Sequence, residues 1–336
     1  MLRKYLKKAV SGRNLTSAEM GEAFELLTSG TVPHSQIGAF LAALQIKGVS
    51  GGELSGAAAV MRRAANFIDC GQREVVDVVG TGGDGSNTFN ISTTSCFVAA
   101  GAGVAMAKHG NRAATSRCGS ADVLAELGVN LDAPAEKVEA SIVENGIGFL
   151  FAAKLHPVMG RMRIIRGELG IPTVFNLLGP LTNPAGAKYQ VIGVFAPELT
   201  ELFAGALRDL GSHRALVVHG MDGLDEISCC APTRVSELAD GEIRTYELLP
   251  EMFFDGSYDK SELSGGDAKE NAAIMLDVLS GRDRGARRAV VLLNAGAVSY
   301  VSGLAPTIAD GVKLAEKSID SGAALEKLEI LKEAVK

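Results

Sequence analysis

EVVDVVGTGGDG, residues 74–85, joins a short β-branched strand directly to a glycine loop. Valine-rich segments bounded by glycine favour strands, so we expect a strand over 74–79 and a loop over 80–85. The residues that follow predict a helix over 90–101 and a second strand over 104–107. This order of strand, glycine-rich turn, helix and strand is typical of a parallel α/β sheet.

The C-terminal half continues the alternation. Further strands are expected at 189–194, 214–218 and 289–294, and the helices between them include 198–210 and 269–279. The pattern predicts an α/β fold in which a mainly parallel sheet carries helices on both faces.

Residues 1–68 are expected to be all-helical. Thr16 and Ser50 each precede a glutamate three positions later, which is the pattern of a capping box at a helix start. Residues 156–169 predict another helix, and a turn rich in glycine and proline follows at 179–184. Because this piece interrupts the alternation, we expect it to return to the N-terminal helices. The predicted domains are a smaller all-helical one, 1–70 completed by about 158–186, and an α/β one, 71–157 and 187–336.

The composition argues against several classes of protein. Acidic residues outnumber basic ones, 39 to 33, and the net charge of −6 disfavours general binding to nucleic acid or anionic membranes. Five cysteines without a C-x-x-C pair indicate neither a disulfide framework nor a zinc site. There is no apolar run of 18 residues and no signal-peptide pattern, so we expect a cytoplasmic protein.

One interval of the chain is free of acidic residues. Residues 85–121 contain no Asp or Glu, although they include Lys108, His109, Arg112 and Arg117. A polar, glycine-rich segment without negative charge, in a protein that is acidic overall, favours a bound anion.

The glycine loop admits three interpretations. Its Gly80-x-Gly82-x-x-Gly85 spacing matches a dinucleotide fingerprint, but that fingerprint also needs an acidic residue about 20 positions later to bind the ribose. The acid-free interval therefore disfavours NAD. A tight turn without a ligand is the second interpretation. We favour the third, a phosphorylated ligand, because loop amides, the first turn of the helix at 90–93 and Lys108 would converge on it.

Several longer motifs are more specific than this loop. They are GTGGDG at 80–85 with TFNIST at 88–93, KHGNR at 108–112, GSAD at 119–122, FNLLGPLTNP at 175–184, Asp225-Glu226, and GDAKEN at 266–271. In these motifs the chain resembles the anthranilate phosphoribosyltransferase family, nearly from end to end. The resemblance implies a nucleoside phosphorylase/phosphoribosyltransferase-like fold.

The resemblance also implies an activity. Enzymes of this family transfer the phosphoribosyl group of phosphoribosyl pyrophosphate (PRPP) to the amine of anthranilate, giving N-(5-phosphoribosyl)anthranilate and pyrophosphate, in tryptophan biosynthesis. It implies two Mg²⁺ ions, with Ser92 as a ligand of one and Asp225 and Glu226 as ligands of the other. A homodimer formed through the helical domain is a further implication.

The remaining site residues are carried over in the same way. Gly80, Asn111 and Arg166 would bind anthranilate. The residues expected to bind PRPP are Gly80, Gly83, Asp84, Thr88, Asn90, Ile91, Ser92, Thr93, Lys108, His109, Gly110, Asn111, Arg112, Ala113, Ala114, Thr115, Ser116 and Ser120. No general base is assigned, because His109 and His156 could equally be structural.

Arg166 has an alternative interpretation. It shares its predicted helix with Arg161 and Arg163, so it could belong to a solvated basic face. Two positions also depart from the family pattern: Cys118 stands where Ser is usual, and Pro172 where Arg is usual. Neither residue is an expected ligand. The two departures therefore bear on the fine substrate preference of the protein more than on the class of reaction.

Two other functions are compatible with the fold class. One is a pyrimidine nucleoside phosphorylase, against which Asn111-Arg112 and the Asp225-Glu226 pair argue. The other is a non-catalytic relative that binds nucleic acid, which should be basic over its open face and lack Asn111 and Arg166. The acidic composition and the presence of both residues disfavour it.

Overall fold

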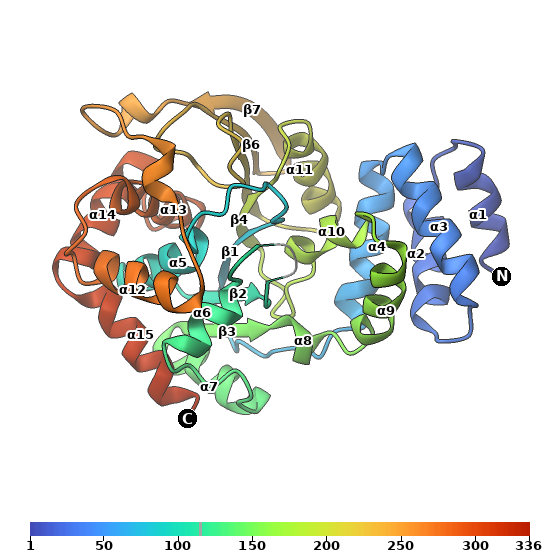
Figure 1. Cartoon of the computed structure of the whole chain (residues 1–336), viewed down its shortest axis with the longest axis horizontal. Coiled ribbons are helices and arrows are strands. Elements are labelled where there is room, and N and C mark those ends of the chain that lie inside the picture. The colour runs from blue at the N-terminus through green and yellow to red at the C-terminus, as the bar shows by residue number, and fades with distance from the viewer. Residues whose placement is uncertain (114–115) are drawn as a thin grey trace.

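The N-terminal helices form a bundle that lies beside a larger α/β body (Figure 1). The structure is a computed structural model that describes residues 1–113 and 116–336. The bundle consists of α1 (Arg3–Val10), α2 (Ser17–Thr28), α3 (His34–Lys47) and α4 (Gly51–Arg63). The expected capping boxes are present: the Thr16 hydroxyl accepts from the Glu19 N–H at the start of α2, and Ser50 and Glu53 do the same for α4.

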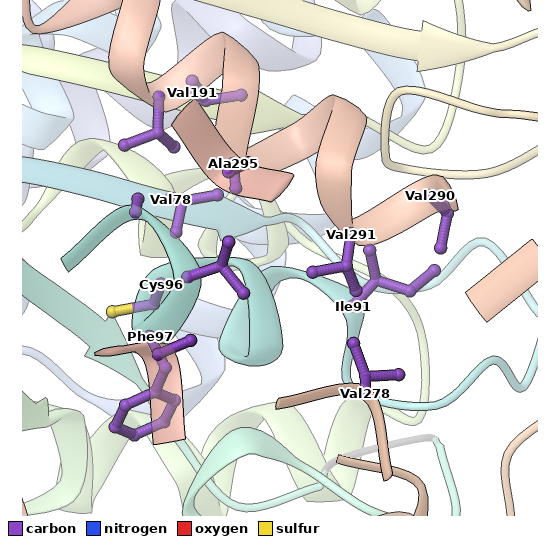
Figure 2. Packing of buried hydrophobic residues seen from close by; sticks show 14 of the residues in the cluster. Val78, Ile91, Cys96, Phe97, Val191, Val278, Val290, Val291 and Ala295 are labelled. Atoms are coloured by element: carbon purple, nitrogen blue, oxygen red, sulfur yellow. The ribbon is translucent and has the colours of Figure 1, made fainter. Parts of the chain in front are cut away.

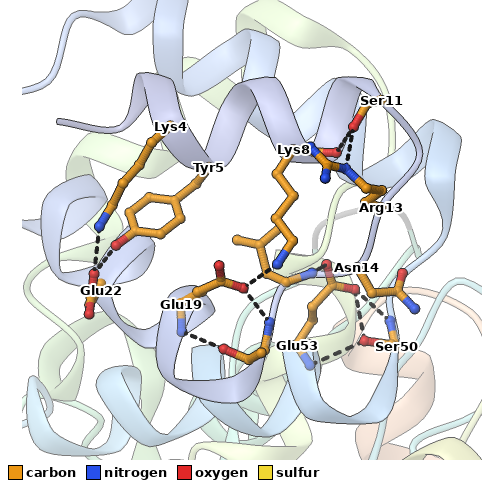
Figure 3. Close-up of polar contacts among 12 residues, drawn as sticks. Lys4, Tyr5, Lys8, Ser11, Arg13, Asn14, Glu19, Glu22, Ser50 and Glu53 are labelled. Atoms are coloured by element: carbon orange, nitrogen blue, oxygen red, sulfur yellow. Dashed lines mark hydrogen bonds and ion pairs between the residues drawn. The ribbon is translucent and has the colours of Figure 1, made fainter.

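A buried ion pair fixes the join between α3 and α4. Lys47 Nζ lies 2.7 Å from Glu53 Oε2, and the Glu53 side chain is fully buried. The same carboxylate accepts hydrogen bonds from the backbone of Leu15 and from Ser50 (Figure 3). Because a buried charge is costly without partners, these bonds make Glu53 a specific anchor for the turn between the helices.

The α/β body is built on one sheet. The described residues form seven strands in the order β3-β2-β1-β4-β5-β6-β7, of which the first five are parallel and the last two antiparallel. The strands are β1 (Val76–Gly80), β2 (Met106–Gly110), β3 (Ile147–Phe151), β4 (Tyr189–Gly193), β5 (Arg214–Gly220), β6 (Thr233–Ala239) and β7 (Glu242–Leu248). The expected α/β class with a mainly parallel sheet and an added helical domain is confirmed.

Alternate strand residues enter two separate cores. On one face, Val78 and Val191 pack with α5 (Ile91–Gly101) and α13 (Ala286–Val301), as Figure 2 shows. On the other face, Ile192 and Val217 belong to a cluster that includes α11 (Leu199–Asp209) and the buried side chains of the bundle. Both faces are therefore covered, as β-branched parallel strands require.

The segment after β3 returns to the bundle side of the molecule (Figure 1). It contains α8 (Ala152–Leu155), α9 (Met159–Leu169), α10 (Phe175–Leu178) and the 3₁₀ turn η1 (Gly179–Leu181). Met162 and Ile165 of α9 and Phe175 of α10 are buried in the same cluster as the helices of the bundle. The Phe175 ring centroid lies 5.5 Å from that of Phe24 in α2.

The other helices cover the sheet and its ends. They are α6 (Ser120–Glu126), α7 (Ala135–Asn145), η2 (Pro250–Met252), η3 (Lys260–Leu263), α12 (Ala268–Leu279), α14 (Ile308–Asp320) and α15 (Ala323–Ala334). Within the described part of the chain, none of the helices has the length and apolar character needed to cross a membrane.

One expected strand is wrong. Residues 289–294 lie inside the 16-residue helix α13, whose side chains from Ala289 to Ser299 are all buried. A short apolar run is compatible with a central strand or a helix enclosed on all sides, and here the run continues beyond strand length. The helix expected over 156–169 begins three residues later than predicted, because α9 starts at Met159 and residues 156–158 separate it from α8.

Candidate active site

Four parallel strands end in glycine at the same edge of the sheet. β1, β2, β4 and β5 end at Gly80, Gly110, Gly193 and Gly220. The loops after these strands carry most of the residues expected to bind ligand. A crevice beyond the carboxyl ends of parallel strands is the usual ligand site of such sheets, so this edge is the candidate site.

The glycine loop after β1 has a left-handed backbone that only glycine adopts easily. The φ angles of Gly82, Gly83 and Gly85 are 64°, 79° and 69°. The Gly82 N–H donates to Asp225 Oδ2 at 2.7 Å, and the Ser86 N–H donates to Asp84 Oδ1 at 3.2 Å. The loop thus turns an amide toward an acid from a distant part of the chain.

The acid pair after β5 meets two of the expected anion-binding elements. Asp225 accepts from the glycine loop, and Glu226 Oε1 accepts from the Ser92 N–H at the start of α5, at 3.0 Å. A helix N-terminus favours negative charge, which explains why a carboxylate lies there. The structure therefore brings Ser92, Asp225, Glu226 and the loop together.

Two glycines allow this close approach. A Cβ atom on Gly80 would overlap the Asp225 carboxylate, and one on Gly193 would overlap the Asp225 backbone carbonyl. The acid loop can lie against β1 and β4 only because both strands end without a side chain.

The two carboxyl groups are short of positive charge. Burial and the nearby Asp84 together raise the pKa of Asp225 to about 7, against the opposing effects of the Gly82 N–H and Lys108. Burial and the adjacent Asp225 raise the pKa of Glu226 well above its usual range. A hard divalent cation would relieve this electrostatic cost, so the donors fit a magnesium ion.

The protein supplies only part of such a coordination shell. Among the described residues, no three His, Cys, Asp or Glu side chains group closely enough to hold a metal by themselves. Mg²⁺ usually takes one or two carboxylates and completes its shell with water and phosphate oxygens. The acid pair and the Ser92 hydroxyl could supply part of such a shell, and water and phosphate oxygens would supply the rest.

Lys108 is buried beneath the helix start. Only 3% of the residue is exposed. Its Nζ donates to the Val78 carbonyl at 2.5 Å and to Ser92 Oγ at 3.4 Å. The positive charge expected at the end of β2 therefore lies under the site, between β1 and α5.

The loop after β2 is fastened to the start of α6. Asn111 N–H donates to Ser120 Oγ, while Asp122 accepts from the N–H groups of Ala113 and Gly119 and from the Arg112 guanidinium at 2.9 Å. Burial alone would raise the pKa of Asp122, but these donors outweigh it and hold the pKa below its usual value. Ser116 Oγ donates to the Cys118 carbonyl, whereas Ala114 and Thr115 lie outside the described residues.

At the start of α5 some of the expected PRPP ligands have buried side chains, and others are partly exposed. Ile91 and Thr93 have side chains buried in the core, so only their backbone can face a ligand. Thr88 and Asn90 are partly exposed and lie on the loop side. Thr88 forms an isolated antiparallel bridge with Ser264, which joins the segment between the glycine loop and α5 to the segment before α12.

Arg166 projects from α9 rather than from the sheet. Its guanidinium lies 5.7 Å from the Phe175 ring centroid and donates to Asn176 Oδ1 at 3.4 Å. Burial lowers its pKa. Within the described residues, no hydrogen bond joins it to Asn111, the other side chain expected to bind anthranilate.

Sequence reasoning missed a buried network under the site. Asp77 of β1 accepts from the His109 N–H at 3.0 Å and from Asn183 Nδ2 at 2.8 Å, and burial raises its pKa to about 6. His109 Nδ1 donates to the Gly179 carbonyl, so its Nε2 accepts from His156 Nε2, 3.2 Å away. The signal was an Asp inside the β-branched run 74–79, because such an acid must find buried partners.

Comparison with known proteins identifies the class first. Residues 72–325 match the glycosyl transferase family, a/b domain, and residues 3–65 match the helical bundle domain of that family. The chain therefore belongs to this glycosyl transferase family.

The particular family follows from full-length relatives. The chain is 54% identical to anthranilate phosphoribosyltransferase of Desulfosudis oleivorans, over 100% of this chain and 99% of the relative. It matches the crystal structure of anthranilate phosphoribosyltransferase from Thermus thermophilus at 44% identity and a TM-score of 0.93, covering 98% of each chain. The Saccharomyces cerevisiae enzyme, in complex with PRPP and Mg, matches at 32% identity and a TM-score of 0.90, over 99% of this chain and 97% of that one. The chain belongs to the anthranilate phosphoribosyltransferase family, and the expected membership is confirmed.

Proposed function

We propose that this chain transfers the phosphoribosyl group of PRPP to the amine of anthranilate, releasing pyrophosphate, in tryptophan biosynthesis. One observation carries the proposal beyond family membership. The Asp225-Glu226 pair meets the glycine loop and the start of α5 at the carboxyl edge of the sheet. This arrangement combines anion-binding amides with donors for a hard cation, which a pyrophosphate substrate requires.

PRPP is proposed to lie over the glycine loop and the start of α5. Gly83 and the other glycines of the loop allow close approach of backbone N–H groups, and Thr88 and Asn90 are partly exposed on the same side. The proposed PRPP ligands are those expected from the sequence: Gly80, Gly83, Asp84, Thr88, Asn90 to Thr93, Lys108 to Ser116, and Ser120.

Two Mg²⁺ ions are proposed to assist. Ser92 would hold one, and Asp225 and Glu226 the other. The solved yeast relative with PRPP and Mg supports magnesium use. When bound, the ions would neutralise charge on the pyrophosphate.

The side chains of this protein then have distinct tasks. Lys108 places a fixed positive charge beneath the pyrophosphate side of the site, where it stabilises the charge that builds on the leaving group. Asn111 and Arg166, with the backbone of Gly80, are proposed to orient anthranilate. Its aromatic amine is neutral at pH 7, so positioning rather than a general base prepares the nucleophile.

The two domains and their assembly belong to the same proposal. We infer that about 158–186 completes the helical domain 1–70, because α9 and α10 share a core with its helices. The other domain would comprise 71–157 and 187–336. We further infer a homodimer through the bundle, since Val10 and Ile46 are 70% and 88% exposed on α1 and α3. A cytoplasmic location, where a biosynthetic enzyme meets its metabolites, completes the proposal.

The activity is tested with PRPP, Mg²⁺ and anthranilate, by following the fall in anthranilate fluorescence. No fall with folded protein would refute the activity. Phosphate-dependent cleavage of thymidine, or salt-sensitive DNA binding without turnover, would instead support one of the two rival functions.

The metal ligands are tested by replacing Asp225→Asn and Glu226→Gln together. Because both charges are lost while the shapes are kept, we expect turnover to fall at least about 100-fold, or about 2.7 kcal/mol. The exposed Glu242→Gln is the matched control and should behave as wild type. Unchanged turnover and Mg²⁺ dependence in the double variant would show that the ligand assignment is wrong.

A further inference from the structure

The GDAKEN motif at 266–271 has no part in the proposed ligand set. It begins α12, where Asp267 accepts from the Glu270 N–H and caps the helix. Asn271 stands in the first turn and is only 1% exposed. A buried amide must find hydrogen-bond partners, so its contacts show what the motif does beyond starting a helix.

The side chain of Asn271 reaches into the PRPP side of the site. Its Oδ1 accepts from the Gly266 N–H at 2.8 Å, and its Nδ2 donates to Asn90 Oδ1 at 2.9 Å. Asn90 Nδ2 in turn donates to the Cys118 carbonyl at 3.2 Å. Asn271 therefore determines which way the amide of Asn90 faces.

Cys118 completes the same arrangement. Its Sγ lies 3.6 Å from Asn90 Oδ1 and 3.5 Å from the Gly119 carbonyl, so its one proton can serve either acceptor, while Asn271 Nδ2 donates to the same Asn90 oxygen. With the oxygen occupied and one N–H bonded to Cys118, the second N–H of Asn90 has no partner among residues 1–113 and 116–336. Asn90 is half-buried, so this N–H is available to a ligand.

The backbone before Asn271 holds the segment 87–89, which joins the glycine loop to α5. The Phe89 N–H donates to the Leu263 carbonyl, and the Gly265 N–H donates to the Asn87 carbonyl, at 3.1 and 3.0 Å. Gly265 must lack a side chain, since a Cβ would lie 2.6 Å from Phe89 N and 2.7 Å from Asn271 Oδ1. The segment 263–266 and Asn271 thus act on the same few residues of the site.

We propose that Asn271 is a positioning residue for PRPP, acting through the side-chain amide of Asn90. The inference rests on the proposed function and deepens it. Asn271 touches no substrate itself; it directs the free N–H of Asn90 toward the phosphorylated ligand and fixes the loop that carries it.

The test compares Asn271→Ala and Asn271→Asp with wild type. The aspartate keeps the size and the acceptor for Gly266, but it cannot donate to Asn90. Both variants should raise the KM for PRPP about tenfold, the effect of losing one oriented hydrogen bond. The KM for anthranilate should change less than about twofold, because the amide faces PRPP.

Two controls separate positioning from general destabilisation. Leu279→Ala removes a fully buried side chain from the same helix, about 12 Å further along it, and should lower Tm without changing the KM for PRPP. In an Asn90→Ala background, Asn271→Ala should add less than a twofold effect, because its target is gone. A full effect in that background, or an equal loss of PRPP affinity in Leu279→Ala, would overturn the proposal.

Binding and exchange measurements keep this test separate from the activity. Calorimetric titration with PRPP and Mg²⁺ measures the tenfold loss of PRPP affinity in the Asn271 variants without any turnover. If wild type does not consume anthranilate, that result refutes the proposed function but not the role of Asn271. A wild type that does not bind PRPP at all would overturn the proposal. Amide hydrogen exchange of residues 88–92 adds a measurement that does not depend on turnover: faster exchange in Asn271→Ala supports the positioning role, and wild-type exchange overturns it.

Discussion

At the scale of single residues, the site depends on glycines that permit close approach as much as on charged groups. The Asp225 loop lies against the end of β4, where Gly193 leaves no space for a Cβ atom. Gly193→Ala should therefore displace the acid pair. We expect a loss of about 1–3 kcal/mol in the free energy of unfolding from overpacking. Turnover should fall at least about tenfold, since a small misplacement of reacting groups is costly.

Gly205→Ala is the matched control for this prediction. Gly205 lies inside α11, where an added Cβ would meet no atom within 4 Å. Alanine in a helix interior should stabilise the protein by about 0.5–1 kcal/mol and leave turnover unchanged. Thermal unfolding and the fluorescence assay measure both effects. Normal turnover in Gly193→Ala would show that the acid loop does not depend on this contact.

The sequence predicted the kinds of binding site better than it predicted which residues contact each other. The acid-free interval indicated an anion site, and the separate Asp225-Glu226 pair indicated a cation site. The hydrogen bond from Gly82 to Asp225 joins residues 143 positions apart, so no local pattern could predict it. The backbone N–H groups of Gly82 and Ser92 were expected to face phosphate. In the structure they donate to these two carboxylates, which only the fold reveals.

At the scale of elements, the periodic helices, the first strands and the buried helix α5 could be predicted, whereas the buried helix α13 could not. α13 was mistaken for a strand at 289–294 because burial on all sides removes the amphipathic stripe that marks a helix. The β6–β7 hairpin was missed although Asp240-Gly241 lies at its turn, with φ angles of 52° and 80°. An Asp-Gly pair with positive φ is a strong hairpin signal, so this miss was avoidable.

The contact between His109 of β2 and His156, which follows α8, predicts that the stability of the fold depends on pH. Burial and the neighbouring His156 together lower the pKa of His109 from 6.5 to about 3, and burial lowers the pKa of His156 from 6.5 to about 4. Below pH 6.5 the unfolded chain therefore binds protons that the folded chain does not. The stability from these two groups is present above pH 6.5 and is lost as pH falls toward 4.

His156→Gln isolates this contribution. Between pH 6.5 and 4.5 the free energy of unfolding of wild type should change more steeply than that of the variant, by up to about 1.4 kcal/mol per pH unit for one proton. Urea unfolding at several pH values measures the difference. The comparison at pH 8, where both imidazoles are neutral in both states, gives the packing cost alone. Equal slopes would mean that His156 is not held neutral by the fold.

At the scale of the whole molecule, the site lies where the sheet and the bundle side of the molecule meet. One core lies between the sheet and α5 and α13, whereas the other is continuous from the sheet through α11 into the bundle. α9, which carries Arg166, packs on the bundle side, and the anion-binding loops stand on the sheet. The proposed anthranilate ligands Asn111 and Arg166 therefore stand on different parts of the molecule, the sheet and the bundle side.

The exposed apolar side chains of the bundle predict the state of assembly. Val10 and Ile46 stand on α1 and α3, which contact each other, and both are largely exposed. If they lie in the dimer interface, replacing both with glutamate should place charges against an apolar partner surface and yield monomers. Sedimentation equilibrium of wild type and of Val10→Glu with Ile46→Glu measures this. Leu304→Glu, a 46% exposed leucine in the α/β body, is the control and should remain dimeric. A wild type that sediments as a monomer, or a double variant that stays dimeric, would show that this face of the bundle does not join two copies.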